Sequence, residues 1–185
     1  MAEYNLKNGQ SVIIRVAKIE DAQAMIDLIK TADTESKFLA REEGEFKTSL
    51  EREREILTNV INNESGSWFI AEIDGRVVGQ CNVGFIRSYF RYRHRAEVSF
   101  VILREYCHLG IGGKMMEQCL KWCKDKNIEQ VELDVVTINE SALNMYRSFG
   151  FEITGTLPRA LKYEDGTYAD EYYMVKNCCT ENTDG

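Results

Sequence analysis

Histidine is scarce in this chain of 185 residues, and the cysteines lack the spacing of a metal site. Only His94 and His108 occur, and no two cysteines form a Cys-x-x-Cys pair. A zinc site or a disulfide framework is therefore not expected, and a reducing compartment fits this cysteine usage. Cys119 and Cys123 fall within an apolar helical pattern and are interpreted as core residues.

The chain also lacks a long apolar segment and an excess of positive charge. No window approaches the roughly 18 consecutive apolar residues of a membrane span. The N-terminus, MAEYNLKNGQ, has no basic stretch followed by an apolar run. A cytoplasmic protein without a membrane partner is therefore expected. The formal net charge of -7 disfavours binding to nucleic acid, which rewards a basic face.

The composition suits a single domain, because 44% hydrophobic and 29% charged residues allow a proper core. Hydrophobic patterns predict strands at 11–17, 68–73, 77–86, 97–103, 131–135, 151–157 and 167–175, and helices from about 21, at about 45–62, from 110 and at 140–149. Consecutive hairpins beside crossover helices predict an α/β fold of the α+β type. Its mixed, mostly antiparallel sheet should have about seven strands and about four flanking helices.

A strand, a glycine-rich turn and a helix follow one another in EVSFVILREYCHLGIGGKMMEQC. Glycines at Gly110, Gly112 and Gly113 would let a phosphate approach the first helical amides, which lack internal acceptors and lie at the positive end of the helix dipole. A Walker A loop is excluded because His108 takes its first glycine position. A dinucleotide fingerprint is excluded because Met115 takes its third. Close packing of the helix start remains the alternative interpretation.

A second pattern, NESALNMYRSFGF, follows the strand at 131–135. Asn139 is a favourable residue to cap the next helix. Tyr146 lies about two turns further along, on the same helical face. Taken alone, Asn139 is a cap and Tyr146 is core packing with its hydroxyl at the rim.

Together the two patterns resemble the GNAT superfamily of acetyl-CoA-dependent N-acetyltransferases. The first is similar to its (Q/R)-x-x-G-x-(G/A) motif, although Cys107 stands at the Gln/Arg position and a side-chain contact to acetyl-CoA is missing. The second matches the pattern N-x-x-A-x-x-x-Y-x-x-x-G-F at Asn139, Ala142, Tyr146, Gly150 and Phe151. The resemblance covers residues 12–176. It implies the GNAT fold in a single N-acetyltransferase domain, residues 1–177, followed by a flexible tail, residues 178–185.

The resemblance implies where acetyl-CoA, the co-substrate, should bind. Its pantetheine arm is expected to pair with the backbone of Phe100, Val101 and Ile102, where two strands splay apart, and to contact Asn139. Tyr146 is expected to contact the cofactor and to act as general acid toward the leaving thiolate. The pyrophosphate is expected on the turn formed by His108, Leu109, Gly110, Ile111, Gly112, Gly113 and Lys114.

Glu97 is the candidate general base. A free alkyl amine has a pKa of about 10.4, so it arrives protonated and cannot attack a thioester. A base must remove that proton, and water can relay it. Glu97 lies on the strand beside the expected thioester. Alternatively, Glu97 faces solvent or pairs with an arginine of the segment Arg91–Arg95.

The resemblance implies direct acetyl transfer to a primary amine of a small molecule or of a protein N-terminus. A non-catalytic domain that binds or senses acyl-CoA is the alternative. The basic, aromatic segment Arg87–Arg95 could grip an acidic acceptor, the 3′-phosphate of CoA or RNA, or it could be a solvated loop. The acidic net charge argues against nucleic acid. A homodimer would follow the habit of the family.

Overall fold

The computed structural model describes residues 2–178. In this range the chain forms eight strands and four α-helices. The strands are β1 (Ala2–Asn5), β2 (Ser11–Val16), β3 (Gly66–Ile73), β4 (Arg76–Phe85), β5 (Arg95–Ile102), β6 (Gln130–Val136), β7 (Glu152–Lys162) and β8 (Tyr168–Asn177). The helices are α1 (Ala22–Glu35), α2 (Leu50–Asn63), α3 (Ile111–Asp125) and α4 (Glu140–Ser148).

All eight strands belong to one sheet, in the order β1-β2-β3-β4-β5-β6-β8-β7. Among the strands of residues 2–178, only β5 and β6 are parallel neighbours, and every other pair is antiparallel. The mixed, mostly antiparallel sheet with four helices is thus confirmed. The strand beyond the predicted seven is β1, which pairs with β2 at the sheet edge. Its four residues are too few to show an alternating pattern.

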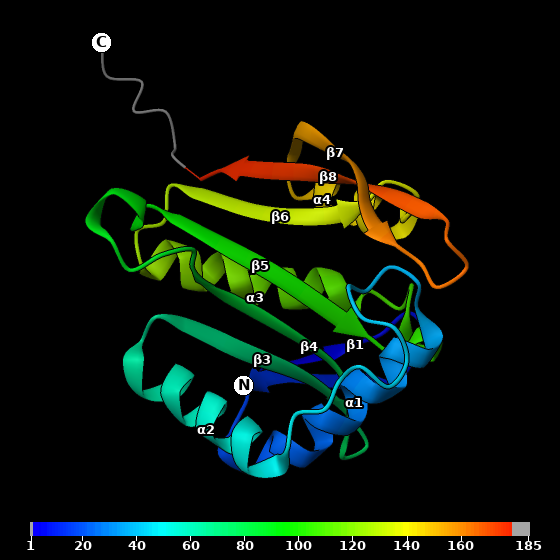
Figure 1. Cartoon of the computed structure of the whole chain (residues 1–185). Coiled ribbons are helices and arrows are strands. Elements are labelled where there is room, and N and C mark those ends of the chain that lie inside the picture. The colour runs from blue at the N-terminus through cyan, green and yellow to red at the C-terminus, as the bar shows by residue number, and fades with distance from the viewer. Residues whose placement is uncertain (1, 179–185) are drawn as a thin grey trace.

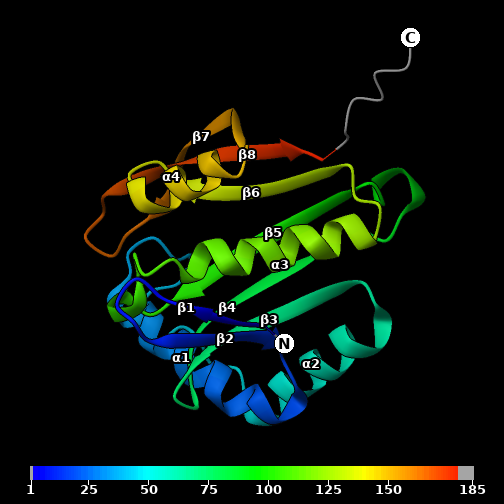
Figure 2. The ribbon, with the colours of Figure 1, turned by 180° about the vertical axis from the view of Figure 1, so that it is seen from behind.

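The helices cover the two faces of the sheet unequally (Figures 1 and 2). Helices α3 and α4 lie behind the sheet in the view of Figure 1. Helices α1 and α2 lie in front and contact only β3, β4 and β5 extensively. The front of β6 and β8 is therefore left uncovered, and the candidate site opens on this side.

A buried core lies on each face of the sheet. Behind the sheet, α3 buries the apolar stripe predicted from its sequence, with successive turns contributing Ile111, Met115, Cys119 and Cys123. In front, a smaller cluster includes Met25, Leu28, Leu57 and Ile70, from α1, α2 and β3. These two cores fix the sheet between its helices, so the strand ends that frame the cleft have a rigid support.

Two predicted turn signals are present where expected. Asp74 and Gly75 join β3 to β4 with φ angles of 50° and 78°, as a tight primed turn requires. Gly150, with φ of 81°, ends α4. The apolar pattern predicts the start of α2 at about Glu45, and this is wrong. Ser49 caps the helix by accepting a hydrogen bond from the Arg52 amide at 3.2 Å, so residues 36–49 form an irregular connection.

The segment Arg87–Arg95 connects β4 to β5 and enters β5 at its last residue. The glycine-rich turn follows the other end of β5, so the eight residues of this strand separate the two segments by roughly 25 Å. At the C-terminus, the amide of Cys178 donates to the Glu129 carbonyl at 2.7 Å. The remainder of the predicted tail, from residue 179, lies outside the described residues. No helix within residues 2–178 is long and apolar enough to cross a membrane.

Candidate active site

A cleft of about 1600 Å³ opens where β5 and β6 diverge. The two strands pair only through Arg95 with Gln130, Ala96 with Val131, and Glu97 with Glu132. Beyond Glu97, the edge of β5 that faces β6 has no strand partner in the described part of the chain, although β5 continues to Ile102. The cleft extends from the open front of the sheet to the first residues of α3 and α4.

The glycine-rich turn presents unpaired amides to this cleft. Gly110 has φ of 96°, and a Cβ placed there would have nothing within 4 Å, so its backbone conformation, rather than space, requires glycine. The first amide of α3 with an acceptor in its own helix is that of Lys114, which donates to the Gly110 carbonyl at 3.2 Å. The amides of residues 111–113 have no such acceptor. This helix start fits an anion such as a pyrophosphate.

Gly112 has a packing role in the structure. A Cβ at this position would meet the sulfur of Met145 at 2.8 Å, so glycine lets α3 approach α4 closely. The thiol of Cys107 turns away from the turn and toward the carbonyls of Ile102 and Leu103, at 3.9 and 3.6 Å. Burial raises the pKa of this thiol. Cys107 therefore offers no side-chain contact to an anion on the turn.

Tyr146 lies at the base of the cleft and is only 7% exposed. Its ring stands between Phe100 and Phe151, with centroids 6.1 and 5.9 Å away. Burial raises the pKa of its hydroxyl, and the nearby thiols of Cys119 and Cys81 add to the effect. The hydroxyl therefore stays protonated and can act as a hydrogen-bond donor. On the same helix, the Asn139 side chain accepts from the Ala142 amide at 3.2 Å, as a cap.

Glu97 lines the cleft on the open front of the sheet. Partial burial raises its pKa, and the carboxylates of Asp134 and Glu132 raise it further. Arg95 is not its partner, because the Arg95 guanidinium donates to Glu132 from Nε and from Nη2, the latter at 2.7 Å, and Nη2 also donates to the Tyr173 hydroxyl at 3.4 Å. Glu97 forms no ion pair within residues 2–178, so its carboxylate is available as a base of raised pKa.

The structure brings most of the predicted site residues together. Those that line the cleft are Glu97, Phe100, Val101, Ile102, His108, Gly110, Ile111, Gly112, Gly113, Asn139 and Tyr146. Leu109 does not line it and packs against the core behind the sheet. Lys114 does not line it either, because its ammonium binds Glu117 at 2.7 Å and lies 5.1 Å from the Tyr4 ring.

Two acidic residues of the cleft were not found from the sequence. Asp134 and Glu171 lie on the open front, on β6 and β8. Burial raises the pKa of both carboxyl groups, and their mutual repulsion raises that of Glu171 further. The alternation of β6 indicated that Asp134 faces away from the core. The position of Glu171 beside it depends on the pairing of β6 with β8, which no local pattern reveals.

Comparison with known proteins gives a family match. The family model described as "Acetyltransferase (GNAT) family" matches residues 25–151. The L-amino acid N-acetyltransferase AaaT of Escherichia coli is 29% identical over 108 residues, which are 58% of this chain and 65% of that protein. An N-alpha-acetyltransferase of Sulfurisphaera tokodaii is 32% identical over 119 residues, 59% of this chain and 68% of that protein. The chain thus spans just under two thirds of the length of the first relative.

Solved structures share the fold. A GNAT-family acetyltransferase from Streptococcus pneumoniae superimposes with a TM-score of 0.85 at 24% identity, covering 90% of this chain and 99% of that one. A phosphinothricin acetyltransferase from Sinorhizobium meliloti, solved in complex with acetyl-CoA, gives a TM-score of 0.78 at 19% identity, covering 94% of each chain.

Proposed function

The chain belongs to the GNAT family of acetyltransferases, and we propose that it transfers the acetyl group of acetyl-CoA directly to a primary amine of a small molecule or a protein N-terminus. One observation carries this proposal. Tyr146, Glu97 and the glycine-rich turn, with its unpaired helical amides, all line one cleft. The named activities of the Escherichia coli and Sulfurisphaera tokodaii relatives support the same reaction.

Acetyl-CoA fits the cleft as co-substrate. In our proposal its pyrophosphate lies on the amides of residues 111–113, and its pantetheine arm follows the free edge of β5 at residues 100–102. Asn139 lines the same wall, from the first turn of α4. A solved relative that holds acetyl-CoA supports this choice of co-substrate. This placement leads the thioester toward Tyr146 and Glu97.

The reaction requires two proton movements. Glu97 takes a proton from the ammonium of the acceptor through water, and the free amine then attacks the thioester carbonyl. The new C–N bond forms as the C–S bond breaks, and the second proton of the amine passes to solvent. The departing sulfur accepts a hydrogen bond from the Tyr146 hydroxyl. Because the thiol of CoA has a pKa of about 8.5, below that of the buried tyrosine, stabilisation of the thiolate suffices and complete proton transfer is not required.

A cytoplasmic location belongs to this proposal. Cys81, Cys107, Cys119 and Cys123 are all thiols in the structure. Reduced cysteines suit a reducing compartment.

The test is the release of CoA from acetyl-CoA, detected by mass spectrometry across polyamines, amino acids, aminoglycosides and N-terminal peptides. Mass detection avoids thiol dyes, which the six protein cysteines would consume. Release with one class of amine, lost in Tyr146→Phe, is expected. Binding of acetyl-CoA without release to any amine would contradict the proposal and favour a sensing domain.

A further inference from the structure

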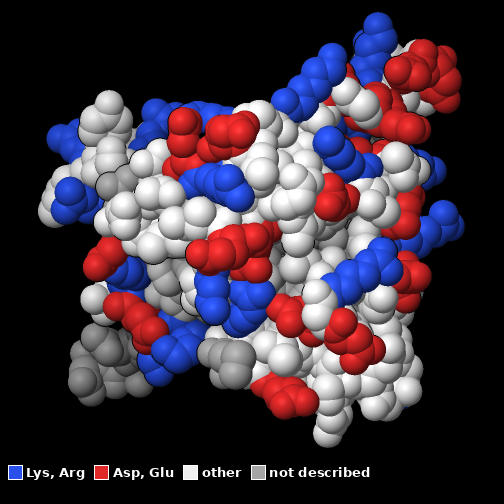
Figure 3. All heavy atoms as spheres, turned by 90° about the horizontal axis from the view of Figure 1, so that it is seen from below, with Lys and Arg blue, Asp and Glu red and all other residues white. Residues whose placement is uncertain are grey.

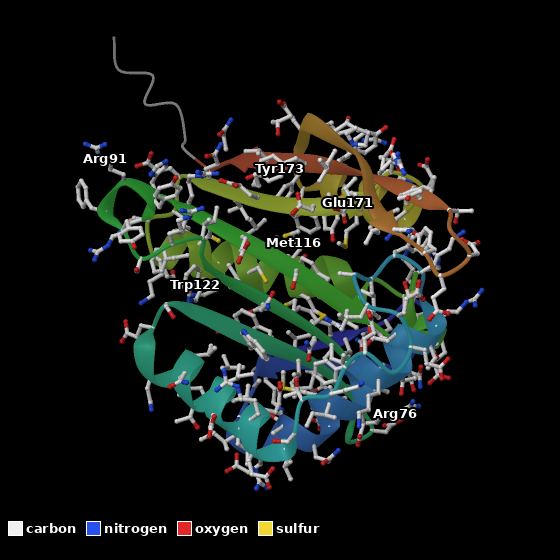
Figure 4. All side chains as sticks on the ribbon, in the orientation of Figure 1. Arg76, Arg91, Met116, Trp122, Glu171 and Tyr173 are labelled. Atoms are coloured by element: carbon white, nitrogen blue, oxygen red, sulfur yellow. The ribbon has the colours of Figure 1, made fainter. Side chains whose placement is uncertain are left out.

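The connection between β4 and β5, residues 87–94, carries exposed cationic and aromatic groups; we call it the basic loop. Tyr89 and Phe90 are 70% and 85% exposed. Arg91 and Arg93 are exposed, and neither forms an ion pair within residues 2–178. Figure 4 shows Arg91 at the tip of this connection, directed into solvent. Exposed aromatic rings beside guanidinium groups are typical of a binding surface.

The position of the basic loop separates it from the cofactor. It precedes β5, whereas the glycine-rich turn follows β5, roughly 25 Å away. The basic loop therefore does not lie beside the amides suited to a pyrophosphate. This distance argues against the 3′-phosphate of CoA as the ligand of the basic loop.

A pocket joins the basic loop to the cleft. It has a volume of about 260 Å³, and Arg87 and Tyr92 of the loop line it together with Tyr173 of β8. Glu97 and Asp134 line both this pocket and the main cleft. In Figure 4, Glu171, Tyr173 and Arg91 lie in succession from the cleft toward the basic loop. An acceptor bound at Glu97 can therefore extend through the pocket to the loop.

Charge changes sign along this path. Glu97, Asp134 and Glu171 surround the reacting end, and an ammonium there would relieve their mutual repulsion. Arg95, midway, is neutralised by Glu132. At the far end, Arg91 and Arg93 have no carboxylate partner within residues 2–178, although Nε of Arg93 donates to the Ser88 carbonyl at 3.3 Å, so both guanidinium groups can bind anions. On the face formed by α1 and α2, which Figure 3 shows, positively and negatively charged side chains are instead mixed.

We propose that the acceptor is a polypeptide N-terminus followed by acidic residues. This inference rests on the proposed function. The terminal ammonium lies among Glu97, Asp134 and Glu171, and carboxylates further along the peptide bind the basic loop. An extended residue spans about 3.5 Å, so side chains from about the third residue onward reach the loop.

The same charges disfavour the other candidate acceptors. A free amino acid carries its carboxylate next to its amine, and would place that carboxylate among Glu97, Asp134 and Glu171. A polyamine has no anionic group for the basic loop. RNA would bring phosphates toward Glu97 and Asp134, which line the adjoining pocket.

The experiment compares three peptides that share their first two residues and then continue with Asp and Glu, with Asn and Gln, or with Lys. Steady-state kinetics with acetyl-CoA should give a KM about tenfold lower for the acidic peptide than for the isosteric neutral one, as expected for a few exposed ion pairs. The double variant Arg91→Glu/Arg93→Glu should abolish or reverse that preference. The control Lys30→Glu/Lys124→Glu makes the same change of net charge at exposed sites on α1 and α3, and should retain it.

Each outcome decides the proposal. Equal KM values for the three peptides, or an acidic preference that survives in the basic-loop variant, would overturn it and leave the proposed function intact. Acetylation of small amines but of no peptide would overturn it as well, and so would competition with the acidic peptide by single-stranded RNA. Absence of both acetyl-CoA binding and CoA release would instead defeat the proposed function. Titration calorimetry with acetyl-CoA separates that case and verifies that each variant is folded.

Discussion

The ring of Tyr146 lies against that of Phe100, with centroids 6.1 Å apart and planes inclined by 49°. Phe100 belongs to the part of β5 that has left β6, and Tyr146 comes from α4 behind the sheet. The contact thus ties together the two walls of the cleft. It also restricts the tyrosine ring, so the hydroxyl has a defined position before any substrate binds.

Tyr146→Phe should lower turnover by about 100-fold, in the range of a positioned acid. The affinity for acetyl-CoA should change little, because the ring and its packing remain. Stopped assays of CoA release measure the turnover, and calorimetry measures the affinity for acetyl-CoA. Tyr4→Phe is the matched control, since it removes a hydroxyl that accepts from Gln118 at 3.0 Å, away from the cleft. Full activity in Tyr146→Phe would rule out the acid role.

Glu97 should set the acidic limb of the pH profile of kcat/KM. A base works only when ionised, so activity should fall as pH drops through the pKa of Glu97. This pKa is raised above the ordinary value of about 4.3 by partial burial and by Asp134 and Glu132. Glu97→Gln should remove the limb along with most of the activity.

Asp134→Asn tests the cause of that raised pKa. Removing the neighbouring negative charge should move the acidic limb to lower pH. Asp125→Asn, which removes an exposed carboxylate of α3, should leave the limb in place. If both variants show the profile of the original chain, the repulsion between Glu97 and Asp134 does not govern the base.

Gly110→Ala should both destabilise the protein and weaken acetyl-CoA binding. Its φ of 96° is strained for any side chain, at a cost of about 1–2 kcal/mol. Gly75→Ala carries the same kind of strain, with φ of 78°, in the hairpin between β3 and β4. Urea unfolding should show similar losses in both variants, whereas calorimetry should show weaker binding only for Gly110→Ala. Equal affinity in the two would argue against the turn as the pyrophosphate site.

Asp21→Asn should lower the free energy of unfolding by about 2 kcal/mol at pH 7. Asp21 accepts hydrogen bonds from both Nη atoms of Arg15, at 2.7 and 2.8 Å, and from the Lys18 amide. Partial burial alone would raise its pKa, but these donors outweigh burial and lower it.

The lowered pKa fixes the pH dependence of that effect. The stabilisation is complete above the pKa of about 3.9 in the unfolded chain, and it is lost as pH falls through the lower pKa of the folded protein. The difference between the original chain and Asp21→Asn should therefore shrink below about pH 4. Asp27→Asn, an exposed carboxylate of α1, is the control in urea titrations at both pH values. A difference independent of pH would mean that ionisation of Asp21 is not its source.

Most elements of this fold were predictable from local pattern. The stripe of α3, the alternation of β6 and the Asp74-Gly75 turn follow from side-chain periodicity and backbone preference, which act over a few residues. Two details were missed, each for its own reason. Strand β1 is too short to show a period, and the cap at Ser49 outweighed the apolar pattern that extended the predicted α2 toward Glu45.

The glycine-rich turn and the spacing of Asn139 and Tyr146 could be recognised from residue types alone, because each depends on one helix start or one helical face. The placement of Glu97, Asp134 and Glu171 on one open face follows from the folded sheet, as does the position of the basic loop at the end of β5 opposite the turn. These relations join residues far apart in the chain. They depend on the strand order β5-β6-β8 and on the point where β5 and β6 diverge. Strand order and strand pairing are in turn determined by the packing of the whole sheet.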